Sequence, residues 1–231
     1  MIVGNGMIAE AFSSYRAQTA VKIFAAGVSR SRETRISEFD RERNLLSSHL
    51  DDFCGCFIYF SSCSVHYLSA ENPYVRHKLL IETEIRNRAD QYLIFRLPQL
   101  VGRSNNPNTL TNYFHERITR GEQFKVFANA TRSLLDVEHA YGICDRLISN
   151  PIFRNSMIDV CLPYAVPVIS IVQALERILQ RPARYDVVPG GEPFFCPPNG
   201  LDTFYADLDI KCDASYVETV LRKYYSQPKP S

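Results

Sequence analysis

The sequence alternates short, continuously apolar runs with segments whose apolar residues recur at helical spacing. The apolar runs are typical of buried strands and cover residues 1–3, 21–26, 56–60, 92–95 and 157–161. The segments with helical spacing cover about 7–15, 37–50, 73–89, 110–121, 137–148, 168–179 and 214–225. Strands that are apolar throughout and alternate with helices predict a parallel sheet covered by helices on both faces.

We therefore predict one α/β domain with a Rossmann-like, doubly wound parallel sheet. With 45% apolar and 22% charged residues in a chain of 231, a single sizeable core is expected. We assign roughly 1–130 and 137–162 to a nucleotide-binding core. Roughly 103–125 and 163–231 are assigned to a small C-terminal substrate lobe, in which the Pro- and Gly-rich stretch 182–199 is expected to be loop.

Charge and hydropathy exclude several classes of function. The formal net charge is +1, which gives no bulk attraction to nucleic acid or to an anionic membrane. No apolar run approaches the roughly 20 residues that cross a bilayer, and the first residues lack a basic head and a cleavage site. We expect a cytoplasmic protein that binds neither nucleic acid nor membrane.

The cysteines predict neither disulfides nor a metal centre. Their number is seven, which is odd, and they are scattered along the chain, so free thiols are expected. Cys54 and Cys56 have no second Cys or His pair at the spacing that zinc requires.

A glycine turn follows the first apolar run. The residues Gly4-Asn5-Gly6-Met7-Ile8-Ala9 match the pattern G-x-G-x-x-A, placed after a strand and before a helix as the motif requires. The glycines let the backbone approach a pyrophosphate at the helix N-terminus. Nucleotide binding is therefore favoured here over a simple tight turn.

A second group of residues can carry acid–base chemistry. Tyr74 and Lys78 are four residues apart on a predicted helix, which places them on one face. Ser62 follows the third apolar run, at the sheet edge where open α/β folds place ligands. The ammonium lowers the pKa of the phenol and makes it an acid or base usable near neutrality, while the Ser hydroxyl bonds the substrate oxygen.

In this order the motifs resemble the NAD(P)-dependent epimerase/dehydratase family, the extended short-chain dehydrogenases/reductases. The resemblance is carried by the glycine turn and by the segments 60–66, 73–78 and 95–102, and more loosely by 132–139. His66 stands where the family usually has a tyrosine, and Ser133 and His139 replace two acids. The resemblance implies a member that lacks about two strands after the first helix, where the adenosine ribose is normally held.

The resemblance also implies roles for individual residues. Ser62, Tyr74 and Lys78 are the expected catalytic residues, and NAD or NADP is the expected cofactor. The residues expected to bind the cofactor are Gly4, Asn5, Gly6, Met7, Ile8, Ala26, Gly27, Arg30, Ser61, Tyr74, Lys78 and Pro98. Ser62, Cys63 and Arg132 are expected to bind the substrate.

Several of these residues have a second interpretation. Arg30 and Arg32 could hold the extra phosphate of NADP or could lie in an exposed basic loop. Arg132 could pair with a diphosphate or with a nearby acid. Cys63 could be a packed thiol rather than a nucleophile, and His66 and His77 are more typical of structural or exposed positions.

The family resemblance implies an enzyme that oxidises, reduces or epimerises a hydroxyl or keto carbon of a nucleotide-activated sugar. The helices from Ser37 and Pro73 resemble those that form the family's homodimer interface. The alternative is a non-catalytic dinucleotide or nucleotide-sugar binding protein of the same fold, acting as a sensor or as a partner subunit.

Overall fold

The computed structural model of the protein describes residues 1–51 and 53–226, which form two compact units. The first unit contains Met1–Leu97 and Ala140–Val160. The second contains Pro98–His139 and, of the described residues, 161–226.

The first unit is built on a five-stranded parallel sheet. Its order is β1-β2-β3-β4-β9, with the strands at Ile2–Val3, Val21–Phe24, Cys56–Ser62, Gln91–Leu97 and Ser156–Asp159. Every neighbouring pair is parallel. All of β2 and nearly all of β3 are buried, as their continuous apolar character predicts. The predicted parallel α/β sheet is confirmed.

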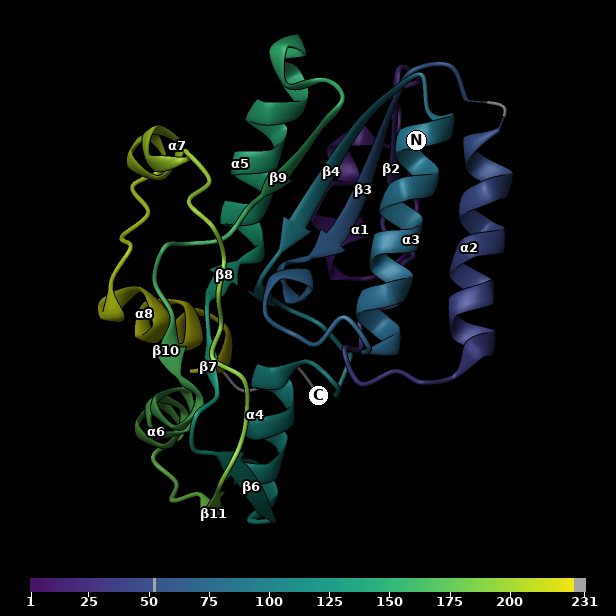
Figure 1. The fold of residues 1–231 in the computed structure, drawn as a ribbon. Helices are drawn as coiled ribbons and strands as arrows, with labels where there is room; N and C mark the ends of the chain where they lie inside the picture. The colour runs from purple at the N-terminus through teal and green to yellow at the C-terminus, as the bar shows by residue number, and fades with distance from the viewer. Residues whose placement is uncertain (52, 227–231) are drawn as a thin grey trace. The chain divides into compact units, whose positions relative to one another are not determined.

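Helices cover both faces of this sheet (Figure 1). They are α1, α2, α3 and α5, at Met7–Ala11, Ile36–Leu50, Pro73–Arg88 and Val137–Ser149, with short 3₁₀ turns at Ser13–Tyr15, Cys63–His66 and Pro151–Phe153. Successive residues of β3 identify the faces. Tyr59 bonds to Glu42 of α2 and Lys78 of α3, whereas the ring of Phe60 packs on Phe12, just after α1, with centroids 5.0 Å apart.

The core between the sheet and α2 and α3 is apolar. It is filled by Val3, Phe24, Leu46, Leu50, Phe57, Tyr59, Ile81, Ile85 and Ile94. The helical members recur at intervals of four residues, so each helix turns one apolar stripe towards the strands. This packing fixes the two helices that carry the charged residues of the site.

The connection between β1 and β2 differs in hand from the next two connections. The steps β1 to β2, β2 to β3 and β3 to β4 run in one direction across the sheet, yet α1 lies on the face opposite to α2 and α3. Such crossovers are right-handed in about 98% of proteins. The opposite hand is expected if two strands are missing after α1, because α1 then keeps its face while β1 joins directly to β2.

In the described part of the second unit, residues 98–139 and 161–226, there are three pairs of short strands and four helices. The pairs are β5 with β8 (Gln99–Val101, Leu134–Asp136), β6 with β11 (Gln123–Phe127, Arg184–Val188) and β7 with β10 (Thr131–Arg132, Val166–Pro167). The helices α4, α6, α7 and α8 cover Leu110–Arg120, Val168–Leu179, Asp202–Asp207 and Ala214–Tyr225. The prediction of loop throughout 182–199 is wrong for β11, which forms because β6 supplies a parallel partner. Among the described residues, no helix combines the length and apolar character needed to span a membrane.

Gly4 is required by the close approach of two strand ends. Its φ is +123°, and a Cβ there would lie 2.6 Å from the carbonyl oxygen of Ala25. An alanine at this position must therefore adopt a backbone conformation that L-residues avoid, and must also displace backbone atoms.

We predict that Gly4→Ala lowers the free energy of unfolding by about 1–3 kcal/mol, measured by chemical denaturation. Gly6→Ala is the matched control, because a Cβ at Gly6 meets no atom within 4 Å and its φ of −87° suits an L-residue. It should change stability by less than about 1 kcal/mol. Equal losses in the two variants would show that the approach to Ala25 is not the constraint.

Candidate active site

Ser62 ends β3 and begins the 3₁₀ turn that follows it. Its Oγ accepts a hydrogen bond from the backbone N–H of Ser64 at 3.1 Å and donates to Ser64 Oγ at 3.0 Å. Ser64 Oγ in turn lies 3.2 Å from the hydroxyl of Tyr67. The turn therefore fixes the Ser62 hydroxyl at the carboxyl end of the sheet, where open α/β folds bind ligands.

Tyr74 and Lys78 lie on the buried face of α3. The side chain of Asn72 caps the helix by accepting from the N–H groups of Tyr74 and Val75 at 2.9 and 3.3 Å, and Pro73 occupies the first turn. The Lys78 ammonium lies 5.7 Å from the centre of the Tyr74 ring, and the Ser62 side chain is near enough to Tyr74 to lower the pKa of its phenol. The structure thus brings the three predicted catalytic residues together.

Lys78 is held by a buried carboxylate from α2. Its Nζ donates to Glu42 Oε1 at 3.1 Å and to the Tyr59 hydroxyl at 2.8 Å. Tyr59 donates to the same Glu42 oxygen at 2.6 Å. Glu42 Oε2 accepts from the N–H of Val28 at 2.6 Å and lies 2.9 Å from His77 Nε2.

The environment of Glu42 keeps its carboxylate ionised. Burial raises the pKa of the carboxyl group, but the charge of Lys78 and the hydrogen bonds from His77, Tyr59 and Val28 outweigh burial and hold the pKa well below its usual range. Glu42 is fully buried and Lys78 is 2% exposed. A charge at this depth requires its partner, because desolvation costs several kcal/mol for each ion.

The pKa of Tyr74 corrects one part of the sequence-based interpretation. Burial raises the pKa of the phenol above its ordinary value of 10, and this effect outweighs the lowering by the charge of Lys78 and by the Ser62 side chain. The carboxylate of Glu42 raises the pKa further. Tyr74 is therefore protonated at neutral pH and is a proton donor in this state.

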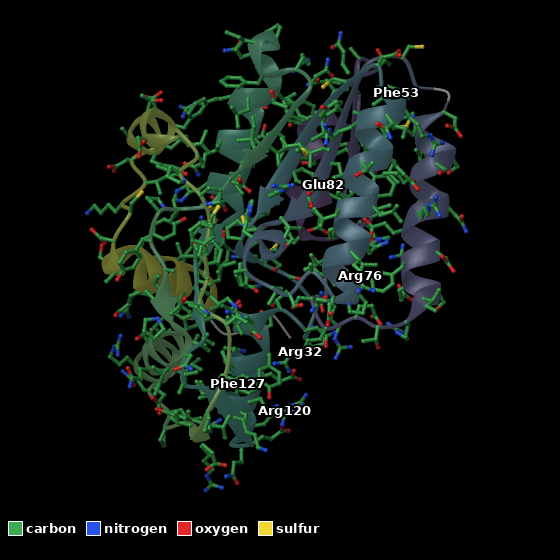
Figure 2. The ribbon with its side chains drawn as sticks, in the orientation of Figure 1. Arg32, Phe53, Arg76, Glu82, Arg120 and Phe127 are labelled. Carbon is green, nitrogen blue, oxygen red and sulfur yellow. The ribbon has the colours of Figure 1, made fainter. Side chains whose placement is uncertain are left out.

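Ser61 belongs to a second buried polar group, on the side of α3. Its hydroxyl donates to Glu82 Oε1 at 2.6 Å, and Glu82 also receives two hydrogen bonds from Arg96 of β4, at 2.9 and 2.6 Å. Figure 2 labels Glu82 on α3. The structure thus engages Ser61, a predicted cofactor ligand, with the protein's own carboxylate.

Two further predicted neighbours of the site are also bonded within the first unit. His66 Nε2 lies 2.7 Å from Asp159 Oδ1, and the thiol of Cys63 donates to the carbonyl of Arg96 at 3.3 Å. Cys63 is completely buried, which agrees with a packed thiol. Together with the Glu42 contact of His77, these bonds give both histidines structural partners.

The predicted phosphate-binding residues lie at the carboxyl ends of β1 and β2. Gly4, Asn5 and Gly6 are exposed, and Met7 and Ile8 begin α1 half-buried. Ala26 and Gly27 follow β2, and a Cβ on Gly27 would lie 2.9 Å from both Glu42 Oε1 and Lys78 Nζ. Gly27 therefore leaves room for that ion pair, while Arg30 is exposed in the loop beyond.

Pro98 and Arg132 belong to the second unit. Pro98 directly follows β4. Arg132 lies in β7, and its guanidinium donates to the carbonyl oxygens of Thr131 and Glu192 at 2.6 and 3.0 Å.

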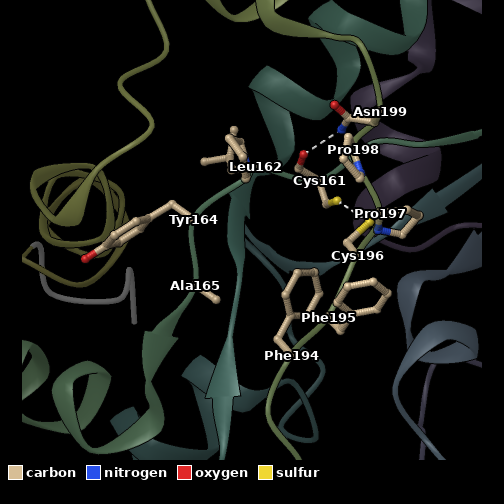
Figure 3. A pocket seen from close by; sticks show the side chains of 11 residues that line it. Cys161, Leu162, Tyr164, Ala165, Phe194, Phe195, Cys196, Pro197, Pro198 and Asn199 are labelled. Atoms are coloured by element: carbon tan, nitrogen blue, oxygen red, sulfur yellow. Dashed lines mark hydrogen bonds between the residues drawn. The ribbon is translucent and has the colours of Figure 1, made fainter.

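The second unit also contains a pocket between two of its own segments, 161–165 and 194–199 (Figure 3). In its wall the Sγ atoms of Cys161 and Cys196 are 2.6 Å apart, and Asn199 and Tyr205 both donate to the carbonyl of Cys161. The pocket volume is about 210 Å³, below the roughly 300–1,000 Å³ typical of ligand sites. Taken alone, it is too small for a nucleotide-activated sugar.

Sequence reasoning missed Glu42, although a signal was present. Phe39, Leu46 and Leu50 mark the apolar face of α2, and Glu42 follows Phe39 by three residues and precedes Leu46 by four. An acid on an apolar helical stripe is unfavourable unless it is paired. That position therefore indicated a buried cationic partner, which the structure identifies as Lys78.

Comparison with known proteins identifies the fold. The sequence matches no protein-family model and no curated protein, but solved structures match most of the chain. RMD from Pseudomonas aeruginosa, complexed with NADPH, is 15% identical with a TM-score of 0.69, covering 96% of this chain and 95% of its own. UDP-glucose 4-epimerase from Thermus thermophilus, complexed with NAD, is 12% identical with a TM-score of 0.70, covering 93% and 79%.

A third structure agrees with these two. The dTDP-glucose 4,6-dehydratase from Bacillus anthracis, in complex with NAD, is 11% identical with a TM-score of 0.66, covering 95% of this chain and 76% of its own. The chain therefore has the Rossmann-like fold of the NAD(P)-dependent epimerases and dehydratases, the extended short-chain dehydrogenase/reductase fold. The fold predicted from the motifs is confirmed.

The buried ion pair predicts a large loss of stability when one partner is removed. We expect Lys78→Met to lower the free energy of unfolding by about 3–5 kcal/mol, because Glu42 is left buried without its counter-charge. Chemical denaturation measures the loss.

Arg41→Met is the control on the neighbouring surface. Arg41 pairs with Glu38 at 3.1 Å, with the two side chains 46% and 33% exposed, and such pairs contribute about 0–1 kcal/mol. A Lys78→Met loss no larger than that of Arg41→Met would contradict the importance assigned to the buried pair.

Proposed function

We propose that the protein is an NAD(P)-dependent oxidoreductase or epimerase that acts on a hydroxyl or keto carbon of a nucleotide-activated sugar. The observation that carries the proposal is the convergence of Ser62, Tyr74 and Lys78 at the carboxyl end of β3. Tyr74 lies beside the Lys78 ammonium, and both Lys78 and Ser62 lower the pKa of its phenol. A nucleotide-activated sugar is supported as the substrate class by the epimerases and dehydratases that share the fold.

The residues of the site can handle the proton of such a reaction. Tyr74 is protonated at neutral pH and donates its phenolic proton to a carbonyl oxygen as negative charge develops there, and it recovers a proton in the reverse direction. The single O–H of Ser62 donates to Ser64 Oγ in this structure, and it would turn to donate to the same oxygen of a bound substrate. The ammonium of Lys78 favours the phenolate that forms when Tyr74 gives up its proton.

The glycine turn fits the pyrophosphate of a dinucleotide. The chain leaves β1 towards the face of α1 and leaves β2 towards the face of α2, and neighbouring strands whose connections diverge in this way mark the ligand site of an open sheet. Gly4 to Ile8 and Ala26 to Gly27 lie at this point. Bound nicotinamide would supply the hydride donor or acceptor.

Arg30 is the proposed ligand for an additional phosphate, because it is exposed beyond β2. On the family resemblance, Pro98 is proposed to bind the cofactor, and Cys63 and Arg132 are proposed to bind the substrate. A homodimer through α2 and α3 is part of the proposal, and exposed Leu79 and Leu80 of α3, 39% and 44% accessible, support it. A cytoplasmic location completes the proposal.

A non-catalytic dinucleotide or nucleotide-sugar binding protein is the second candidate. Two observations favour it. Within the described residues β1 forms the edge of the sheet, so the strands that would hold the adenosine ribose are missing. The Lys78 ammonium already has Glu42 and Tyr59 as partners. A sensor or partner subunit requires binding of the nucleotide and not proton transfer by Tyr74.

We predict that Tyr74→Phe lowers turnover by about 10²- to 10⁴-fold while dinucleotide binding is retained, because the substitution removes the transferable proton and leaves the glycine turn intact. Turnover is measured by nicotinamide absorbance or product analysis with UDP- and dTDP-sugars, and binding by calorimetry. Tyr92→Phe, in β4 of the same unit, is the matched control and should keep full turnover.

The same measurements separate the two candidates. Undiminished turnover in Tyr74→Phe would contradict the proposed mechanism. Dinucleotide or nucleotide-sugar binding without any change at the nicotinamide, in the unmodified protein and with every sugar nucleotide tried, would establish the binding protein instead.

A further inference from the structure

Among the described carboxylates of the first unit, Glu42 has the most hydrogen-bond partners. Its two oxygens interact with residues from three segments of the chain: the loop after β2, strand β3, and two adjacent positions of α3. Its carboxylate and the Lys78 ammonium fill the space beside Gly27, at the end of β2. The ion pair therefore lies beside the end of β2, and its lysine is one of the proposed acid–base residues.

We propose that Glu42 is a positioning residue for the acid–base site: it holds Lys78 in place and sets how much of the lysine's charge reaches Tyr74. The proposal rests on the proposed function for its catalytic meaning. Its structural and electrostatic content concerns residues within the first unit and can be tested without any substrate.

The bond directions support this role. An ammonium has three N–H donors, and Lys78 directs one to Glu42 Oε1 and one to the Tyr59 hydroxyl, which itself donates to Glu42. These three groups close a ring of hydrogen bonds. Without Glu42, Lys78 keeps the neutral Tyr59 but loses its anion, so both its position and the field around it change.

The charged and titratable groups around the pair come from each neighbouring element. From α3, His77 contacts Glu42, and from β3, Tyr59 contacts both ions. Tyr74 senses Lys78 and Glu42 with opposite signs. Tyr67, from the segment before α3, and Tyr59 of β3 are further titratable groups that interact with it. The balance between one cation and one anion therefore determines the electrostatic effect on Tyr74.

The test is the ionisation of Tyr74, followed by NMR of the full-length protein labelled with ¹³C at the tyrosine Cζ. Tyr74→Phe identifies the signal by its loss. In Glu42→Gln the phenol should ionise at lower pH than in the unmodified protein, because the Lys78 cation is no longer offset. In the double variant Glu42→Gln/Lys78→Met, which removes both charges, the midpoint should return towards that of the unmodified protein.

Glu82→Gln is the matched control, since Glu82 is also a buried carboxylate but pairs with Arg96 one turn further along α3. It should leave the Tyr74 midpoint unchanged. If Glu42→Gln does not fold, the double variant and Lys78→Met still test the proposal, because Lys78→Met alone should move the midpoint to higher pH. An unchanged midpoint in Glu42→Gln, or equal midpoints in Lys78→Met and the double variant, would overturn the role of Glu42.

The readout separates this inference from the proposed function. Loss of turnover in Tyr74→Phe concerns the reaction, whereas the ionisation of Tyr74 reports Glu42 and Lys78 in a protein of either function. If turnover is found, its pH profile in Glu42→Gln should also move to lower pH, in step with the NMR midpoint. A merely structural role for Glu42 predicts lower stability with no such movement.

Discussion

The buried ion pair between Glu42 and Lys78 joins helix α2 to helix α3 in the first unit. Either ion alone would lose several kcal/mol of hydration at this depth, so the two must meet, and their meeting fixes α2 against α3. Tyr59, His77 and the N–H of Val28 then complete the carboxylate's hydrogen bonds. The same ion pair explains the glycine at position 27, because a Cβ there would lie 2.9 Å from both Glu42 Oε1 and Lys78 Nζ. The position of Lys78 beside Tyr74 is thus a consequence of an ion pair that spans 36 residues of sequence.

Much of the fold follows from local pattern. Apolar runs predicted the five strands of the sheet because strands buried on both faces need apolar residues throughout, and α6 and α8 begin and end where the helical spacing does. The first helix was predicted to reach Tyr15 but ends at Ala11 and continues as a 3₁₀ turn. The strand β11 was missed for another reason: Arg184–Val188 is only partly buried, and its partner β6 lies some sixty residues earlier. A pairing of that range leaves little trace in local sequence.

The site shows the same division between local and long-range information. The spacing of Tyr74 and Lys78 on one helical face, and the place of Ser62 after a strand, were sufficient to bring the three together. The electrostatics were not predictable in that way, because the sign of the pKa shift of Tyr74 depends on how deeply the phenol is buried and on a carboxylate from another helix. Ser61 shows how much one position matters: its hydroxyl donates to Glu82 of α3, whereas the hydroxyl of Ser62, the next residue, bonds to Ser64 in the following turn.

The connection from β1 to β2 explains how the shortened sheet can still offer a ligand-binding edge. With two strands missing, α1 keeps its own face of the sheet and β1 becomes the edge of the described sheet. The chain therefore still leaves β1 and β2 towards opposite faces. That divergence is what makes the carboxyl edge of an open sheet a ligand site, and the exposed glycine turn lies on it. Among the described residues no further strand extends beyond β1 to hold the adenosine ribose of a dinucleotide. The affinity for a dinucleotide bound there would therefore come from its phosphates and from its nicotinamide end, near Lys78. The ion pair of Glu42 and Lys78 lies beside Gly27 at the end of β2, and so connects this edge of the sheet to Tyr74, the proposed proton donor on α3.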